Sequence, residues 1–403
     1  MITLETAESA LKDVYLGVIN NTLNFRSNPL LAKIKQTTND VWGKEIVKLA
    51  PYGVNGGIGV GTETGNLPDA SGNNYVQLRS TLKNLYGSIE ISDKAIRASQ
   101  NSAGAFVNLL NAEMEGLITS SMFNLSRMLY GDGTGKICYA TSASGKVITC
   151  SSVKHLMEGM IVEFLTTAGT GVVANSRRKI VSIDRDLNKI TLDATLPTGV
   201  SYPSAICVQN SFNNELTGLN SIISSSAKIY GLTRSDYGWL NPCIKELNGA
   251  ISDMHIQSML DKLEERTGNP IDFIVCSSDV KRYYQNYLST FRRNIDYMDL
   301  QGGYKAMSYA GIPVVTERFT NDQEMYFLNT KDFTLHQLCD WQWLEGEDGR
   351  IIKQKQGFPI YYATLVKYAD LMCDRPHGQG KMKKILEEDP TPVVTPDAGT
   401  VGE

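Results

Sequence analysis

The sequence lacks the features that mark secreted, zinc-binding and membrane-spanning proteins. Its seven cysteines are an odd number, and no two of them are spaced as C-x-x-C. This pattern argues against a disulfide framework or a zinc site and favours a reducing cytoplasm. No apolar run approaches the roughly 18 residues that a membrane-spanning helix needs. The acidic, amphipathic start MITLETAESALKDVY does not resemble a signal peptide, so no membrane association is expected.

The sequence also lacks the basic excess of a nucleic-acid-binding protein. It has 39 Lys and Arg against 43 Asp and Glu, for a net charge of −4. The short basic clusters at Arg292-Arg293 and Lys381–Lys384 fit a solvated face better than a nucleic-acid site. A mildly acidic protein can lie near nucleic acid without binding it tightly.

Motifs of catalysis, cofactor binding and metal binding are absent as well. Residues Gly131–Lys136 resemble a phosphate-binding loop, but the spacing to lysine is one residue short. Asp184, Asp186 and Asn188 begin like a calcium loop, but Lys189 stands where the loop requires glycine. The four histidines lie far apart in sequence. We therefore predict no catalytic, cofactor or metal residues, and no enzyme.

The most prominent stretch of the sequence predicts one long amphipathic helix over residues 102–130. Ser102 can cap its first turn, and no proline interrupts it. At about 1.5 Å per residue the helix would be about 40 Å long. Gly131 and Gly133 follow it and permit the positive φ of a helix C-cap. The apolar residues that recur at helical spacing are Phe106, Leu110, Met114, Leu117, Met122, Leu125 and Met128.

A glycine-rich segment, residues 51–75, predicts a long hairpin with a mobile tip. Strand-like residues flank it at 45–49 and 76–91, and so long a loop is unusual inside a compact domain. A two-stranded arm is marginally stable alone, so we expect it to lie on another surface. The residues of the tip that we expect to form the interface with that surface are Gly53, Gly56, Gly57, Gly59, Gly61, Gly65 and Pro68.

The remaining segments alternate in character. Residues 4–25 predict an amphipathic helix, and residues 136–212 predict a small all-β module of five or six short strands. A second helix is expected to begin at Asn241-Pro242 and to end at Gly268. A strand at 273–277 and a helix at 278–290 follow.

The last part of the chain predicts further strands and then a tail. Gly311 and Pro313 are expected to be structural residues of the stretch 311–315, which leads into Glu317, Arg318 and Phe319. The residues after Leu386 are acidic and proline-rich, which indicates disorder.

The order of these parts resembles the major capsid proteins of tailed bacteriophages, the HK-ninety-seven-like fold. The phrases that carry the resemblance are AFVNLLNAEMEGLITSSMFNLSRMLYGDGTG, FIVCSSDVKRYY, YAGIPVVTERF and MYFLNTKDFTL. The resemblance covers most of residues 1–375 and implies an α+β fold with an inserted small all-β domain. The domains it implies are an N-terminal arm (1–45), an E-loop hairpin (46–91), the spine helix of a P domain (92–135), the inserted β domain (136–212), an A domain with returning P-domain strands (213–375) and a partly disordered C-terminal tail (376–403).

The resemblance implies a structural protein of the virion. Such a chain self-assembles into an icosahedral shell of hexamers and pentamers that encloses double-stranded DNA, contacted non-specifically. It would assemble in the host bacterial cytoplasm. Because Met1 begins almost directly at the arm, a separate scaffolding protein is expected, together with a portal and decoration proteins.

Two alternatives remain open from the sequence. One is an encapsulin-like nanocompartment shell that holds a cargo enzyme. The other is an enzyme whose site is not recognisable from its motifs, against which the absence of an acid–base or metal constellation weighs.

Overall fold

The computed structural model describes residues 28–94, 103–290, 297–300, 304–346, 349 and 351–387. The predicted helix at 4–25 lies outside these residues. The described chain divides into two compact units. The first contains the residues up to Pro242 together with Asn329–Gln379, and the second contains Cys243–Leu328 and the residues from Gly380 onward. The chain therefore leaves the first unit and returns to it.

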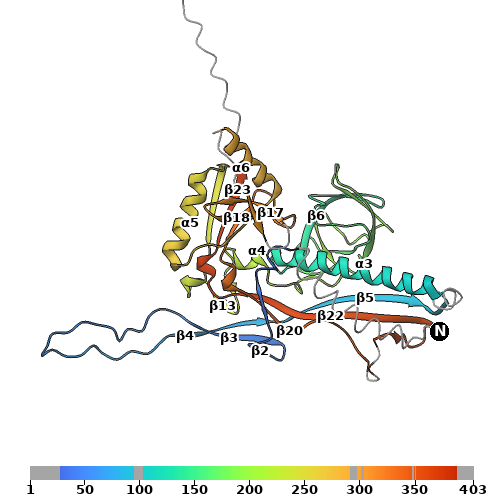
Figure 1. Ribbon diagram of the computed structural model, residues 1–403. Helices are drawn as coiled ribbons and strands as arrows, with labels where there is room; N and C mark the ends of the chain where they lie inside the picture. The colour runs from blue at the N-terminus through green and yellow to red at the C-terminus, as the bar shows by residue number, and fades with distance from the viewer. Residues whose placement is uncertain are drawn as a thin grey trace, which may run out of the picture. The chain divides into compact units, whose positions relative to one another are not determined.

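A five-stranded sheet and one long helix form the frame of the first unit (Figure 1). Strand β5 pairs with β22 without interruption, from Lys83 opposite Ala369 to Ser92 opposite Ile360. The strands of this sheet are β1 (Lys35–Thr37), β5 (Lys83–Ser92), β20 (Phe333–Trp343), β21 (Lys353–Gln354) and β22 (Ile360–Cys373).

Helix α3 (Ala103–Tyr130) runs along β5 and confirms the predicted long helix. The helix and the strand lie close together at Gly87, where a Cβ atom would lie 2.8 Å from Leu117 Cδ1. Leu117 is half-buried, and Met114 is fully buried. The side chains of Phe106 and Leu110 lie outside the described part of the helix. The other buried apolar side chains of the predicted face are Met122, Leu125 and Met128.

The end of α3 depends on close packing of backbone segments. The Gly131 N–H donates to Met128 O at 3.0 Å, and Gly133, rather than Gly131, has the positive φ (+82°). Gly218 lies directly against this end, because a Cβ atom there would fall 2.3 Å from Met128 O. One turn earlier, a buried ion pair joins the Arg127 guanidinium to the Glu215 carboxylate.

Residues 136–208 form a closed six-stranded barrel, in the order β10-β7-β6-β11-β8-β9. Five or six short strands are expected in this stretch, and six are present. Asp184 ends β9, and its Oδ1 accepts from the backbone N–H groups of Asp186 and Leu187, so the calcium-like residues form the turn between β9 and β10. The barrel strands are β6 (Lys136–Ser144), β7 (Val147–Cys150), β8 (Ile161–Phe164), β9 (Arg178–Asp184), β10 (Lys189–Leu192) and β11 (Ser204–Val208). The core contains Ile148, Val162, Phe164, Ile180, Ile190 and Ile206.

Three short elements connect the barrel to the second unit. They are α4 (Leu219–Ile222), the β12–β13 hairpin (Lys228–Ile229 and Leu232–Thr233) and the 3₁₀ turn η1 (Gly238–Leu240).

The second unit is a seven-stranded sheet with two helices packed on it. The strand order is β14-β23-β19-β15-β18-β17-β16. Gly380 allows the approach of α5, because a Cβ atom there would lie 2.7 Å from Leu263 Cδ1. The elements are β14 (Cys243–Ala250), α5 (Asp253–Thr267), β15 (Phe273–Cys276), α6 (Ser278–Thr290), β16 (Tyr297–Leu300), β17 (Tyr304–Tyr309), β18 (Ile312–Thr316), β19 (Met325–Leu328) and β23 (Gly380–Leu386).

The helix predicted to begin at Asn241-Pro242 is wrong in its first two turns. Residues 243–250 form strand β14, which pairs in parallel with β23, and α5 begins only after Ser252. The apolar spacing in this segment suits either element, and the pairing with β23, which is distant in sequence, decides between them. The predicted end at Gly268 is confirmed, with φ +66° at the helix C-cap.

The predicted tail, residues 376–403, begins too early. Residues Pro376–Gly378 form a short 3₁₀ turn (η3), and Gly380–Leu386 form strand β23 in the interior of the sheet. Met382 and Ile385 of this strand are fully buried. Residues 388–403 lie outside the described part of the chain.

Gly311 and Pro313 lie at the hairpin between β17 and β18. Ala310 (φ +49°) and Gly311 (φ +79°) form the two-residue turn, and Pro313 is a buried residue of β18 opposite Ser308. Two positive φ values in a two-residue loop favour glycine, which accounts for Gly311 at this turn.

Candidate assembly surface and a polar groove

The predicted assembly hairpin begins in a three-stranded sheet of β2 (Val41–Trp42), β3 (Glu45–Pro51) and β4 (Tyr75–Thr81). Strands β3 and β4 pair from Glu45 opposite Thr81 to Pro51 opposite Tyr75. The expected hairpin of residues 46–91 is therefore too long at its C-terminal end. After Leu82 the chain enters β5, which pairs with β22 in a different sheet.

The root of this hairpin is anchored in the first unit. Ile46 and Leu78 are fully buried. Lys48 Nζ lies 2.7 Å from Asp374 Oδ2, and the Arg79 N–H donates to Tyr230 O at 3.0 Å. These contacts fix the position where the two strands leave the rest of the unit.

Two buried titratable side chains lie at the root. The Asp370 carboxylate accepts from Ser80 Oγ (2.5 Å) and from the Thr217 backbone N–H (2.7 Å) and Oγ1 (3.0 Å), while burial raises the pKa of this carboxyl. His336 is the cross-strand partner of Asp370, and its Nδ1–H donates to Asn39 O at 3.0 Å. Burial lowers the pKa of His336, and Nε2 has no partner among the described residues.

The hairpin tip, residues 52–74, contains all the predicted interface residues and little internal bonding. Within residues 53–73, which the structure describes completely, the one backbone–backbone hydrogen bond joins the Gly65 N–H to Thr62 O at 3.1 Å. Gly53 has a positive φ (+73°). At Gly59 a Cβ atom would lie 2.9 Å from Pro68 Cγ, so the two sides of the tip touch there.

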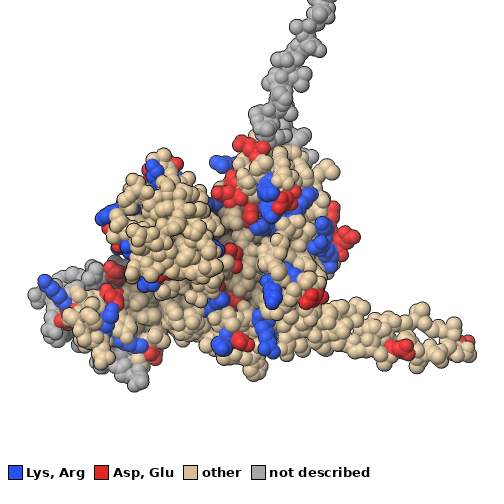
Figure 2. Space-filling view, turned by 180° about the vertical axis from the view of Figure 1, so that it is seen from behind, with Lys and Arg blue, Asp and Glu red and all other residues tan. Residues whose placement is uncertain are grey.

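The tip also exposes apolar side chains that the sequence analysis did not single out. Their exposed fractions lie between 81% and 103%, far above those of an ordinary surface aliphatic residue that rests on its neighbours. The tip has two acidic residues, Glu63 and Asp69, and no Lys or Arg, so this arm is almost free of charge in Figure 2. In the sequence these apolar residues lie between glycines, and this spacing is the signal that could have identified them. The exposed residues are Val54, Ile58, Val60 and Leu67.

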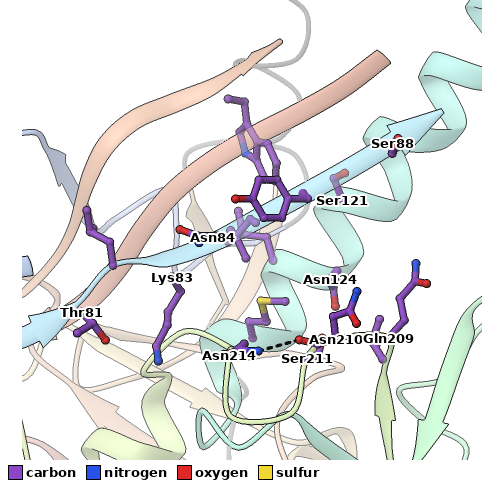
Figure 3. Close-up of a pocket in the computed structure, with 17 residues that line it drawn as sticks. Thr81, Lys83, Asn84, Ser88, Ser121, Asn124, Gln209, Asn210, Ser211 and Asn214 are labelled. Carbon is purple, nitrogen blue, oxygen red and sulfur yellow. Dashed lines mark hydrogen bonds between the residues drawn. The ribbon is translucent and has the colours of Figure 1, made fainter. Parts of the chain in front are cut away.

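A second surface feature of the first unit is a polar groove of about 610 Å³. It is lined by residues of β5, by one face of α3, by the loop after β11 and by Trp341. In Figure 3 the labelled polar side chains of these segments converge on the groove, and the Asn214 side chain donates to Asn210 O at 3.1 Å. The labelled residues are Thr81, Lys83, Asn84, Ser88, Ser121, Asn124, Gln209, Asn210, Ser211 and Asn214.

Neither surface has the composition of an ion-binding centre. No group of three or more His, Cys, Asp or Glu side chains suited to a metal occurs among the described residues. Within the same residues, no helix is long and apolar enough to cross a bilayer.

The sequence matches no family model and no curated protein. The fold, however, is similar to solved structures. The capsid asymmetric unit of cyanophage A-1(L) aligns with a TM-score of 0.53 at 12% identity, over 91% of this chain and 92% of that one. The capsid of an empty GTA particle (TM-score 0.47, 11% identity, 89% of each chain) has a weaker likeness.

An encapsulin is also among the similar structures. The holo-SrpI encapsulin complex from Synechococcus elongatus has a TM-score of 0.44 at 8% identity, over 88% of this chain and 86% of that one. An alignment this weak does not distinguish an encapsulin shell from a phage capsid. The stronger alignment confirms the resemblance found in the sequence at the level of the fold: the chain has the mixed α/β fold of a phage capsid protein.

Proposed function

We propose that the protein is the major capsid protein of a tailed bacteriophage and assembles into a closed icosahedral shell of hexamers and pentamers around double-stranded DNA. A separate scaffolding protein, a portal and decoration proteins would act with it in the cytoplasm of the host bacterium. The inserted β domain, the spine helix and the E-loop are the parts this function would use. The protein acts structurally and has no catalytic role.

The observation that carries the proposal is the contrast between the two ends of the hairpin. The root is buried and ion-paired, while the tip exposes four aliphatic side chains and a backbone with few internal hydrogen bonds. Burying one such side chain contributes about 1.5–3 kcal/mol. The tip cannot gain this energy within its own chain as described, so a second copy is the surface that would supply it.

The experiment replaces Gly53–Asn73 by a two-residue turn in the full chain. Thermal stability of the unassembled protein should stay nearly unchanged, because the buried root contacts remain. Shells, counted by negative-stain electron microscopy with scaffolding protein present, should disappear. A matched control replaces Leu187, an exposed residue of a barrel turn, by serine and should assemble normally. Normal shells from the shortened hairpin would refute the assembly role.

Particle contents distinguish the capsid from the encapsulin-like alternative. Particles purified from infected cells should contain nuclease-protected double-stranded DNA. Particles that instead retain one enzyme species and no DNA would favour the nanocompartment.

A further inference from the structure

The sequence contains two Asn-Gly pairs, Asn55-Gly56 in the hairpin tip and Asn248-Gly249 in β14. Such a pair can react without an enzyme, because the backbone nitrogen of the glycine attacks the side-chain carbonyl carbon of the asparagine. Glycine favours this attack, since it has no Cβ to restrict the backbone or to block the approach. In a folded protein the reaction depends on how the asparagine side chain and the next peptide are held, and the two pairs differ in this respect.

The Asn55 side chain is folded over the peptide that follows it. Its Oδ1 accepts from the Gly57 backbone N–H at 2.9 Å, and this turn-forming contact brings the carbon Cγ toward the Gly56 nitrogen that lies between. The same N–H stabilises the negative charge that develops on Oδ1 during the attack. Asn55 Nδ2 donates to Asn73 Oδ1 at 3.1 Å, so an acceptor also faces the amine that must leave.

The Gly56 nitrogen is open to solvent and is not held by the fold. Gly56 is exposed, and its N–H has no acceptor among the described residues. No hydrogen bond therefore has to break before this N–H loses its proton. The single backbone–backbone hydrogen bond of residues 53–73 joins Gly65 to Thr62, so the peptide can turn toward the asparagine at little cost.

The Asn248-Gly249 pair provides the contrast. Asn248 is exposed, so access of solvent does not separate the two pairs. However, Gly249 lies opposite Ile385 and Ala250 lies opposite Leu386 in the parallel ladder of β14 and β23. Ring closure at Asn248 would move this peptide out of the ladder, which the tip does not require. We expect this pair to react slowly.

We propose that Asn55 is a site of spontaneous intramolecular deamidation. The Gly56 nitrogen loses its proton to hydroxide and forms a bond to Asn55 Cγ. The Cγ–Nδ2 bond breaks, and Nδ2 takes a proton from water and leaves as ammonia. A water molecule then opens the cyclic imide at either of its two carbonyls, which yields aspartate or isoaspartate. The reaction needs no oxidant, reductant or cofactor.

The product changes the chemistry of the hairpin tip. A carboxylate replaces a neutral amide, so the tip gains a third negative charge beside Glu63 and Asp69, next to the exposed side chains of Val54 and Ile58. Isoaspartate also adds one carbon to the backbone. A charge is costly to bury against another copy, so unassembled protein would lose its ability to form shells as it ages. This consequence, unlike the reaction itself, rests on the proposed function.

The experiment incubates the unassembled full-length protein at mildly alkaline pH and follows both pairs by peptide mapping and mass spectrometry, with isoaspartate detected by an isoaspartyl methyltransferase. Asn55 should react at least about tenfold faster than Asn248, and no more slowly than in a synthetic peptide of residues 52–58. Gly56→Ala should slow the reaction about ten- to a hundredfold, because its Cβ hinders the attack. The matched control is Gly72→Ala, another tip glycine with no atom within 4 Å of its Cβ position, and it should leave the rate unchanged.

Three results would overturn the proposal. They are an unmodified Asn55 under conditions in which the peptide reacts, equal rates at Asn55 and Asn248, and an unchanged rate in Gly56→Ala. The effect on assembly is measured separately with fresh protein. Asn55→Asp should reduce the yield of shells, whereas Asn55→Ser, which stays neutral and can still accept from the Gly57 N–H, should not. If fresh wild-type protein forms no shells, the proposed function fails while the deamidation result stands.

Discussion

At the scale of single residues, several glycines are required by lack of space rather than by backbone conformation. Gly218 has φ −80°, which any residue can adopt, yet a Cβ atom there would lie 2.3 Å from Met128 O and 2.5 Å from Gly131 O. Gly135 combines both requirements, with φ +79° and Ser211 O only 2.4 Å from its Cβ position. These contacts join the end of α3 to segments about 80 residues later.

Gly218→Ala should destabilise the protein by about 1–3 kcal/mol, because the methyl group meets backbone oxygens that cannot rotate away. Urea denaturation of the unassembled protein would measure the change. Gly116→Ala is the matched control, since no atom lies within 4 Å of its Cβ position on α3. The control should stabilise by about 0.5–1 kcal/mol, as alanine does in a helix. Equal effects of both variants would contradict the packing argument.

His336 should make the stability of the first unit depend on pH. Burial lowers its folded pKa below the ordinary 6.5, so below pH 6.5 the unfolded chain binds a proton that the folded chain does not. Stability is thus fully present above this pH and falls as the pH drops, by at most about 1.4 kcal/mol per pH unit.

The measurement compares denaturation midpoints of the wild type and His336→Asn between pH 7.5 and 5.5. The asparagine amide can still donate to Asn39 O, but it does not titrate. The variant should therefore show the shallower pH dependence. Identical slopes for the two proteins would show that His336 is not the responsible group.

At the scale of elements, local patterns predicted much of the secondary structure. The long helix and the barrel strands follow from periodicity that acts over a few residues. The segment 243–250 was misread because its partner β23 lies more than 130 residues away. Closure of the barrel and the anchoring of the hairpin root at Asp370 and Asp374 are likewise long-range contacts that no local pattern encodes.

The hairpin tip and the polar groove also differ in how far local sequence patterns predict them. The glycines of the hairpin tip were identified because their composition is unusual. The polar groove was not, because its asparagines come from three segments that are brought together only by folding, and each asparagine alone looks like an ordinary surface residue.

The barrel, residues 136–212, should fold when expressed alone. Its six strands close on themselves, and its apolar core is drawn from those strands and the loops between them. Closure leaves no unpaired edge. Circular dichroism should show a β-type spectrum with a cooperative thermal transition. A random-coil spectrum would mean that the barrel needs contacts from the rest of the first unit.

At the scale of the whole molecule, the chain passes between the two units more than once. The second unit is completed only by Gly380–Leu386, after the chain has returned through Asn329–Gln379 of the first. Neither unit is therefore a continuous segment, and the second depends on the last described strand.

Truncation should reveal this dependence. A chain ending at Gln379 loses buried Met382 and Ile385 from the core of the second unit and should unfold there, with a loss of several kcal/mol. A chain ending at Glu387 should keep wild-type stability. Hydrogen exchange followed by mass spectrometry would locate the loss in residues 243–328. Equal protection in both truncated chains would contradict the role of β23.

The closed barrel begins and ends at one place. Its first and last strands, β6 and β11, are paired neighbours, and Gly135 before the barrel touches Ser211 after it. The chain therefore enters and leaves the barrel through two adjacent strands. A gene could lose, duplicate or exchange this stretch as a cassette without moving the residues on either side. A foreign domain whose own ends are close together could be inserted at the same two strands, for display on an assembled particle.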